Sequence, residues 1–212
     1  MIDRPPDGYP ADMDVVDDLL REHGTSYAEE AGIRLADKPS PLYRLLVLAT
    51  LLSKPINSGV AVAAAHELSR AGYRTPQRML AASWQDRVDA LGRGHYRRYD
   101  ESTATILADS AKLCRDRWRG DLRRLHAAGG SDVRALKDLL TEFPGIGPTG
   151  ADIFLREAQG IWPDIIPYAD EKVLDGARRA HLPASGEKLA GLVPAAKLPA
   201  LMSALVRLGR EH

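Results

Sequence analysis

The stretch Phe143-Pro144-Gly145-Ile146-Gly147-Pro148-Thr149-Gly150-Ala151 separates two segments with helical periodicity. Pro144 and the glycines end the first helix, because glycine adopts backbone conformations that are closed to other residues. Pro148 suits the first turn of a second helix, where its missing N–H is not needed. The stretch therefore predicts a helix, a hairpin and a second helix. The apolar face of the first helix consists of Val133, Leu136, Leu139 and Leu140.

Such a hairpin leaves the backbone N–H groups of Gly145 and Gly147 unpaired at the start of the second helix. Neither residue has a Cβ atom to block approach, so an anion such as a phosphodiester fits there. An ordinary tight connection between two packed helices would also contain a bare Gly-x-Gly. The longer pattern, with a small-residue helix and then Asp170 after Trp162-Pro163, is much rarer by chance.

Residues 143–151 resemble the helix-hairpin-helix of the endonuclease III and adenine glycosylase superfamily of base-excision DNA glycosylases. The resemblance covers roughly residues 40–209 and is strongest over 139–173. It implies an all-α fold of two helical lobes with a cleft between them, and double-stranded DNA with a lesion or mismatch as partner. It also implies DNA-backbone contacts at Gly145, Ile146, Gly147, Thr149 and Gly150.

Asp170 falls where this family carries its catalytic aspartate. A glycosylase first rotates the target nucleotide out of the stack, because the reacting carbon is shielded inside the duplex. Departure of the base leaves positive charge on the sugar, and a carboxylate beside C1′ stabilises that charge or positions water. The alternative role of Asp170 is the N-cap of a helix that starts at Glu171. Both roles can hold.

Bifunctional members of the family attack the sugar with a lysine where Thr149 stands here. A threonine hydroxyl cannot form a Schiff base, so we expect no lysine-dependent strand cleavage. Lys172 lies near Asp170 in sequence, and it is the alternative candidate for an amine at the site.

The family commonly places a glutamine, which fills the gap left by the extracted base, where Pro55 stands. Ile56 or Asn57 could act as the wedge instead, and a simple interhelical loop is the alternative. The adenine-specific branch carries a catalytic glutamate on the preceding helix. Residues 42–66 contain no Asp or Glu, which argues against adenine excision.

Residues 91–98 resemble the Gly-Leu-Gly-Tyr-Tyr-x-x-Arg stretch of adenine glycosylases. The resemblance places His95, Tyr96 and Arg97 at a pocket rim or against a phosphate. A helix-capping turn with exposed arginines explains the same residues.

The charges balance, with 29 basic and 29 acidic residues, which argues against binding of nucleic acid through bulk charge. A positive surface must arise from local clusters such as 93–98 and 115–124, although a solvated helix face with ion pairs also explains the second. The single cysteine, Cys114, excludes an intrachain disulfide and a Cys-ligated cluster within these residues. The histidines show no helical pair, so we expect no metal and no cofactor.

Apolar periodicity predicts a buried core helix over 42–52 and further helices over 59–71, 102–118, 173–180 and 199–209. We predict a central domain of residues 41–164, with the helix-hairpin-helix at about 134–160, and a second lobe of residues 1–40 plus 165–212. No apolar run is long enough for a bilayer, and the N-terminus lacks a signal-peptide pattern. We therefore expect a cytoplasmic monomer, associated with the nucleoid in a prokaryote.

Together these features predict a monofunctional DNA glycosylase that hydrolyses a damaged or mispaired base from duplex DNA without metal or cluster. A helix-hairpin-helix DNA-binding module without turnover is the main alternative. A third hypothesis is an all-α interaction protein, which would show no salt-sensitive DNA binding.

Overall fold

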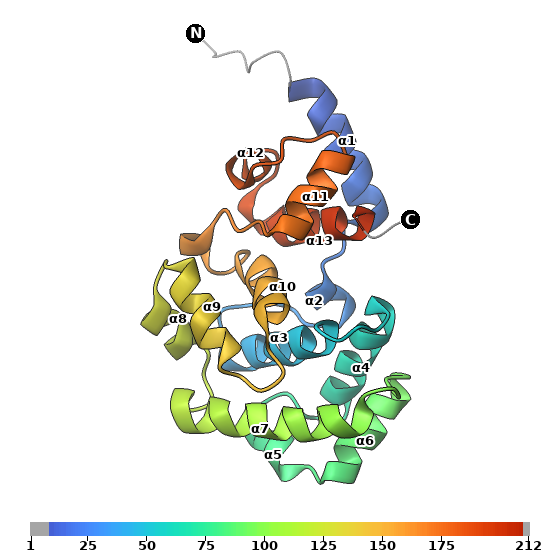
Figure 1. The fold of residues 1–212 in the computed structure, drawn as a ribbon, viewed down its shortest axis with the longest axis vertical. Helices are drawn as coiled ribbons and strands as arrows, with labels where there is room; N and C mark the ends of the chain where they lie inside the picture. Colours follow the sequence, from blue (N-terminus) through green and yellow to red (C-terminus); the bar gives the residue numbers. More distant parts are fainter. Residues whose placement is uncertain (1–8, 210–212) are drawn as a thin grey trace.

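A computed structural model describes residues 9–209, which form thirteen α-helices and two short 3-10 helices and contain no strand. The predicted all-α class is confirmed. The helices gather in two lobes, one above the other in Figure 1. The larger lobe contains α2 (Tyr27–Glu30), α3 (Pro39–Leu52), α4 (Ser58–Arg70), α5 (Pro76–Ala81), α6 (Trp84–Arg93), α7 (Asp100–Trp118), α8 (Arg123–Gly129), α9 (Val133–Thr141) and α10 (Pro148–Ala158).

The core of the larger lobe is built around α3. Its residues 42–52 are buried except for Arg44, as expected for a helix that is apolar on all sides. α3 packs against α4 and α10, while α7 packs against α5 and α6. Cys114 lies inside this core, and burial raises the pKa of its thiol to about 12.

The smaller lobe is built around α13 (Leu198–Leu208), which packs between α1 (Tyr9–His23) and α11 (Glu171–Arg179). Leu201, Met202 and Leu205 of α13 are completely buried. α12 (Gly186–Ala190) and the 3-10 helix η2 (Ala195–Lys197) complete the lobe, and η1 (Pro163–Ile165) lies in the connection that leads to it. No helix in the range 9–209 is both long and apolar enough to cross a membrane.

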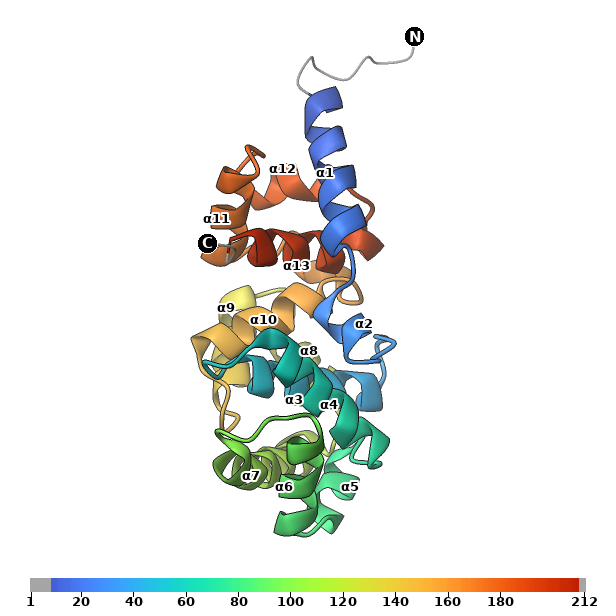
Figure 2. The same cartoon turned by 90° about the vertical axis from the view of Figure 1, so that its right-hand side faces the viewer.

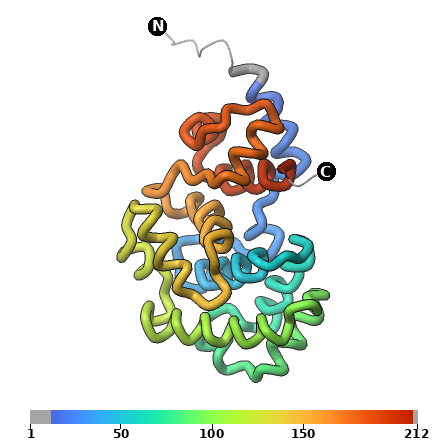
Figure 3. The backbone as a smooth tube through the Cα atoms, viewed as in Figure 1, coloured from blue at the N-terminus to red at the C-terminus, as the bar shows by residue number. Residues whose placement is uncertain are grey.

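The chain passes between the lobes twice, once after α1 and again after α10 (Figure 3). Each lobe has its own cluster of buried apolar side chains. Tyr27, Ala28 and Ile33, from a segment assigned to the second lobe in the sequence analysis, pack in the larger cluster. The division into domains otherwise stays a prediction.

Candidate functional site

The hairpin between α9 and α10 is fixed by two buried side chains, Phe143 and Ile146. Gly145 has a φ of +85°, and a Cβ atom there would lie 2.5 Å from Ile106 Cγ2 and 3.0 Å from Thr50 Cγ2. Only glycine fits this position, because both the backbone conformation and the space exclude a side chain. The hairpin is therefore seated on α3 and α7.

The outer side of the hairpin is open. Gly147 is exposed, and a Cβ atom there would meet nothing within 4 Å. Within residues 9–209, the backbone N–H groups of Gly145, Gly147 and Thr149 have no hydrogen-bond acceptor. The N–H of Ile146 differs, because it donates to the Phe143 carbonyl at 3.0 Å. The amides available to an anion are therefore those of the two glycines and of the first turn of α10.

The second helix of the hairpin also packs closely on the end of α3. A Cβ atom on Gly150 would lie 2.6 Å from Ser53 Oγ. The connection between α3 and α4 consequently begins beside the hairpin.

One face of α10 binds the segment that carries Asp170. Gln159 Oε1 accepts the Tyr168 backbone N–H at 3.0 Å, and Gln159 Nε2 donates to the Tyr168 carbonyl at 3.0 Å. The Tyr168 hydroxyl donates to Asp152 Oδ1 at 2.6 Å. Asp152 is on α10 and Gln159 is the C-cap of this helix, so α10 and its cap fix the backbone and the side chain two residues before Asp170.

Asp170 is the N-cap of α11, since its Oδ1 accepts the Val173 backbone N–H at 3.1 Å. The predicted capping role is confirmed. Its Oδ2 lies 3.3 Å from Nε of Arg156 on α10, and the two side chains are only 8% and 4% exposed. The carboxylate thus lies against the second hairpin helix and not on the outer surface. Its catalytic role stays a prediction.

The charges around Tyr168 form a small network. Lys137 Nζ lies 2.6 Å from Asp152 Oδ1, the same oxygen that accepts from the Tyr168 hydroxyl. Burial is the main reason that the pKa of Tyr168 is raised; the hydrogen bond to Asp152 and the negative charges of Asp152 and Asp170 add to it, and Arg156 opposes it. Tyr168 therefore stays a neutral donor.

Four residues of this network, Lys137, Asp152, Arg156 and Tyr168, were not among the site residues predicted from the sequence. The available signal was the pair Asp152 and Arg156, which are oppositely charged and four residues apart in one helix, and so lie on one face.

The residues predicted as a wedge lie in the connection between α3 and α4. Pro55 and Asn57 are exposed, and Asn57 Oδ1 caps α4 by accepting the Gly59 backbone N–H at 2.8 Å. Ile56 is half-buried and packs against the larger core cluster. The side chain of Ile56 therefore packs partly in the core.

Two of the three candidate DNA-contact residues in the 94–99 connection are exposed to solvent. His95, with a φ of 62°, and Arg97 are exposed, whereas Tyr96 is completely buried in the core. Lys172 is exposed in the first turn of α11. In Figure 2 the hairpin, the 53–57 and 94–99 connections and α11 lie towards the left edge of the molecule.

Three arginines of the 115–124 run are engaged in ion pairs. Arg115 pairs with Asp116 at 2.7 Å and Arg123 with Asp121 at 2.7 Å, and Arg117 pairs with Glu142. These arginines therefore match the alternative interpretation, a solvent-exposed face with ion pairs. No group of three or more His, Cys, Asp or Glu side chains in the described part of the chain could hold a metal ion.

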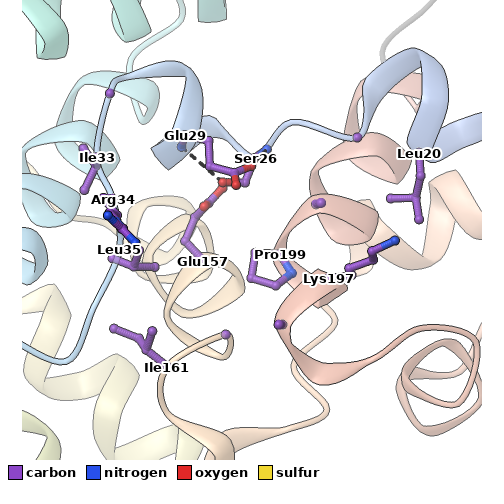
Figure 4. A pocket seen from close by; sticks show the side chains of 15 residues that line it. Leu20, Ser26, Glu29, Ile33, Arg34, Leu35, Glu157, Ile161, Lys197 and Pro199 are labelled. Atoms are coloured by element: carbon purple, nitrogen blue, oxygen red, sulfur yellow. Dashed lines mark hydrogen bonds between the residues drawn. The ribbon is translucent and has the colours of Figure 1, made fainter.

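A cavity of about 760 Å³ lies where the two lobes meet, on another side of α10. Figure 4 shows Glu157 pointing towards Ser26 and Glu29, with Arg34 on one wall and Lys197 on another. Neither the hairpin glycines nor Asp170 line this cavity. It is therefore separate from the candidate site.

Two solved structures have a similar arrangement of helices along almost the whole chain. One is a non-covalent endonuclease III–DNA complex, with a TM-score of 0.52 and 15% identity, over 93% of this chain and 83% of that chain. The fold is endonuclease III-like.

The other is a trapped endonuclease III–DNA covalent intermediate, an estranged-adenine complex, with a TM-score of 0.50, 17% identity, and coverage of 91% of this chain and 81% of that chain. No family model and no curated protein sequence matches the chain. At these identities the similarity establishes the endonuclease III-like fold, in which α9 and α10 form the helix-hairpin-helix.

Proposed function

We propose that this protein is a monofunctional DNA glycosylase, which binds duplex DNA through its hairpin and hydrolytically removes a damaged or mispaired base. The observation that carries the proposal is that one helix, α10, has open amides at its N-terminus and contacts the carboxylate of Asp170 through Arg156. A strand held at the hairpin would then place an extruded nucleotide beside Asp170.

The roles follow from the chemistry of base release. The amides of Gly145, Gly147 and Thr149 bind backbone phosphate oxygens, which fixes the strand without reading its sequence. The negative charge of Asp170 stabilises the positive charge that develops on the sugar as the base leaves. Water completes the reaction, because Thr149 provides no amine for covalent attack.

The wider DNA contacts belong to the exposed connections. We assign Pro55, Asn57, His95 and Arg97 to the surface that meets DNA, on the basis of their exposure. The buried Tyr96 is assigned to packing.

A second candidate function is DNA binding without turnover. It is favoured by the state of Asp170, whose two oxygens face the Val173 amide and the Arg156 guanidinium in a nearly closed environment. A carboxylate with only this capping and pairing role would stabilise the fold and not a reaction.

Base-release assays on a panel of damaged and mismatched duplexes test the proposal. We expect release of at least one base by the wild type and a loss of at least about 100-fold in Asp170→Asn, because the substitution removes the charge that stabilises the sugar cation. Asp132→Asn is the matched control, since Asp132 also caps a helix, α9, by accepting the Arg134 N–H at 2.9 Å.

The same panel separates the two functions. If the duplexes bind but no base is released, the non-catalytic module is correct. Equal losses in Asp170→Asn and Asp132→Asn would show that only helix capping matters. Circular dichroism at the assay temperature confirms that each variant is folded.

Borohydride trapping on an abasic duplex tests the monofunctional assignment. We expect no covalent adduct, because Thr149 cannot form a Schiff base. An adduct that disappears in Lys172→Ala or Lys137→Ala would overturn the assignment and identify the amine.

A further inference from the structure

Two buried arginines in this protein differ in how their donors are used. Arg87, which is 7% exposed, donates to the carbonyls of Ala104 at 2.9 Å, Met79 at 3.1 Å and Ala82 at 2.7 Å. Arg156 is 3% exposed, yet its one hydrogen bond among the described residues is a long one, from Nε to the Asp152 carbonyl at 3.4 Å. Arg87 is thus held by three hydrogen bonds to backbone carbonyls, whereas Arg156 has one long hydrogen bond.

The contact between Arg156 and Asp170 does not satisfy either group. Both Nη1 of Arg156 and Oδ2 of Asp170 are buried, and within residues 9–209 neither has a hydrogen-bond partner. Nε and Oδ2 are 3.3 Å apart but do not have hydrogen-bond geometry. A buried ion pair offsets its desolvation only when further hydrogen bonds complete it. This pair is therefore held weakly for its degree of burial.

A phosphate would satisfy the guanidinium better than Asp170 does. Arginine presents five N–H donors in a planar fork, and phosphate oxygens accept two of them in parallel. If Asp170 meets C1′ of an extruded nucleotide, the phosphates that flank this nucleotide lie within reach of the side chain paired with Asp170. Arg156 also projects from the helix whose N-terminus holds the strand.

We propose that Arg156 is a latch on Asp170 and a DNA-phosphate ligand: it pairs with the carboxylate in the free protein and turns to a flanking phosphate when duplex binds. This inference rests on the proposed function, because it takes Asp170 to be the carboxylate at the sugar. In the free protein the guanidinium cancels the charge of Asp170. Transfer of Arg156 to the phosphate leaves this negative charge available to the sugar cation, so catalysis is confined to the complex.

The salt dependence of DNA binding tests the latch. The probe is a duplex with a tetrahydrofuran abasic analogue, and the dissociation constant is measured over a series of salt concentrations. One phosphate contact contributes about 0.9 to the magnitude of the slope of log dissociation constant against log salt concentration. Arg156→Gln should therefore reduce the magnitude of this slope by about 0.9. Arg207→Gln is the matched control, because Arg207 is also a mostly buried arginine in an ion pair, with Glu30 at 2.9 Å, and should keep the wild-type slope.

A double variant guards against misfolding and against effects of net charge. Arg156→Gln with Asp170→Asn removes both charges, leaves two amides that can pair, and does not change the net charge. We expect it to show the same reduced slope. A wild-type slope in this double variant would overturn the proposal, since the effect of the single variant would then come from net charge.

The rate of base release distinguishes the proposed latch role of Arg156 from a role of Arg156 in the chemical step. The substrate is a duplex with the base identified by the lesion panel. At saturating DNA, Arg156→Gln should release this base at a rate within about threefold of the wild-type rate. The effect of the substitution should appear instead as a higher dissociation constant for the duplex. A fall of about 100-fold at saturating DNA with unchanged binding would overturn the latch. An absence of release in every variant would instead refute the proposed function, while the slope would still report on Arg156.

Discussion

At the scale of the residue, Gly145 and Gly147 have different tasks although they are two positions apart. Gly145 has a φ of +85° and no room for a Cβ atom, so it is required for the fold. Gly147 has an ordinary extended backbone, with φ of −97° and ψ of −171°, and faces open space. Its lack of a side chain serves approach from outside and not packing.

The two glycines therefore predict opposite phenotypes. Gly145→Val should destabilise the protein by roughly 3 kcal/mol or more, because strain and overpacking add. Gly147→Val should keep the wild-type unfolding midpoint in urea but weaken binding to two unrelated duplexes by the same factor, since the contact is to the backbone. A loss confined to one sequence would contradict the role given to the hairpin.

At the scale of the element, α10 combines a free N-terminus with a face that fixes the Asp170 segment. The hydrogen bonds from Gln159 to the Tyr168 backbone and from Tyr168 to Asp152 connect residues 9 and 16 positions apart. The helix therefore relates the position of the strand at the hairpin to the position of the carboxylate.

Removal of this connection should be costly. Gln159→Ala leaves a buried N–H and a buried carbonyl of Tyr168 unpaired, so we expect a loss of about 2–4 kcal/mol in the free energy of unfolding. Tyr168→Phe and Asp152→Asn, measured singly and together, should show a coupling of about 1 kcal/mol in a double-mutant cycle. Strict additivity would mean that the Tyr168 hydroxyl and Asp152 do not interact in solution.

At the scale of the whole molecule, Glu157 of α10 holds three parts of the chain together. Its carboxylate accepts the Tyr27 backbone N–H at 3.0 Å, the Ala28 N–H at 3.4 Å and the Ser203 hydroxyl at 3.1 Å. These partners belong to α2 in the larger lobe and to α13 in the smaller lobe. Burial raises the pKa of Glu157 above its ordinary 4.5, and hydrogen bonding, including that from Ala28 and Ser203, opposes this rise.

The raised pKa has a consequence for stability. A group with a higher pKa in the folded state stabilises that state fully below its unfolded value, and this contribution is lost as the pH rises through the folded value. The free energy of unfolding should thus decline from pH 4.5 upward in the wild type, and decline less in Glu157→Gln. Urea unfolding at several pH values measures this, with the exposed Glu22→Gln as control. Parallel curves for Glu157→Gln and the wild type would contradict it.

Much of the fold was predictable because its determinants are local. The core helix expected over 42–52 is α3, the helix expected over 102–118 is α7, and the last expected helix, 199–209, is α13 shifted by one residue. The hairpin was predicted from Pro144 and the glycines, whose backbone preferences act within a few residues. The capping of α11 by Asp170 was predicted for the same reason, since a cap and its amide are three residues apart.

The sequence by itself determined the main core helices, the hairpin and the position of its open amides. Only the tertiary structure decided what surrounds Asp170: Arg156 comes from a helix 14 positions earlier, and Glu157 reaches an amide 130 positions away. Helix periodicity and glycine conformations are short-range effects. The pairing of charges across α10 depends on the path of residues 159–170 and on the packing of two lobes, which no local pattern specifies.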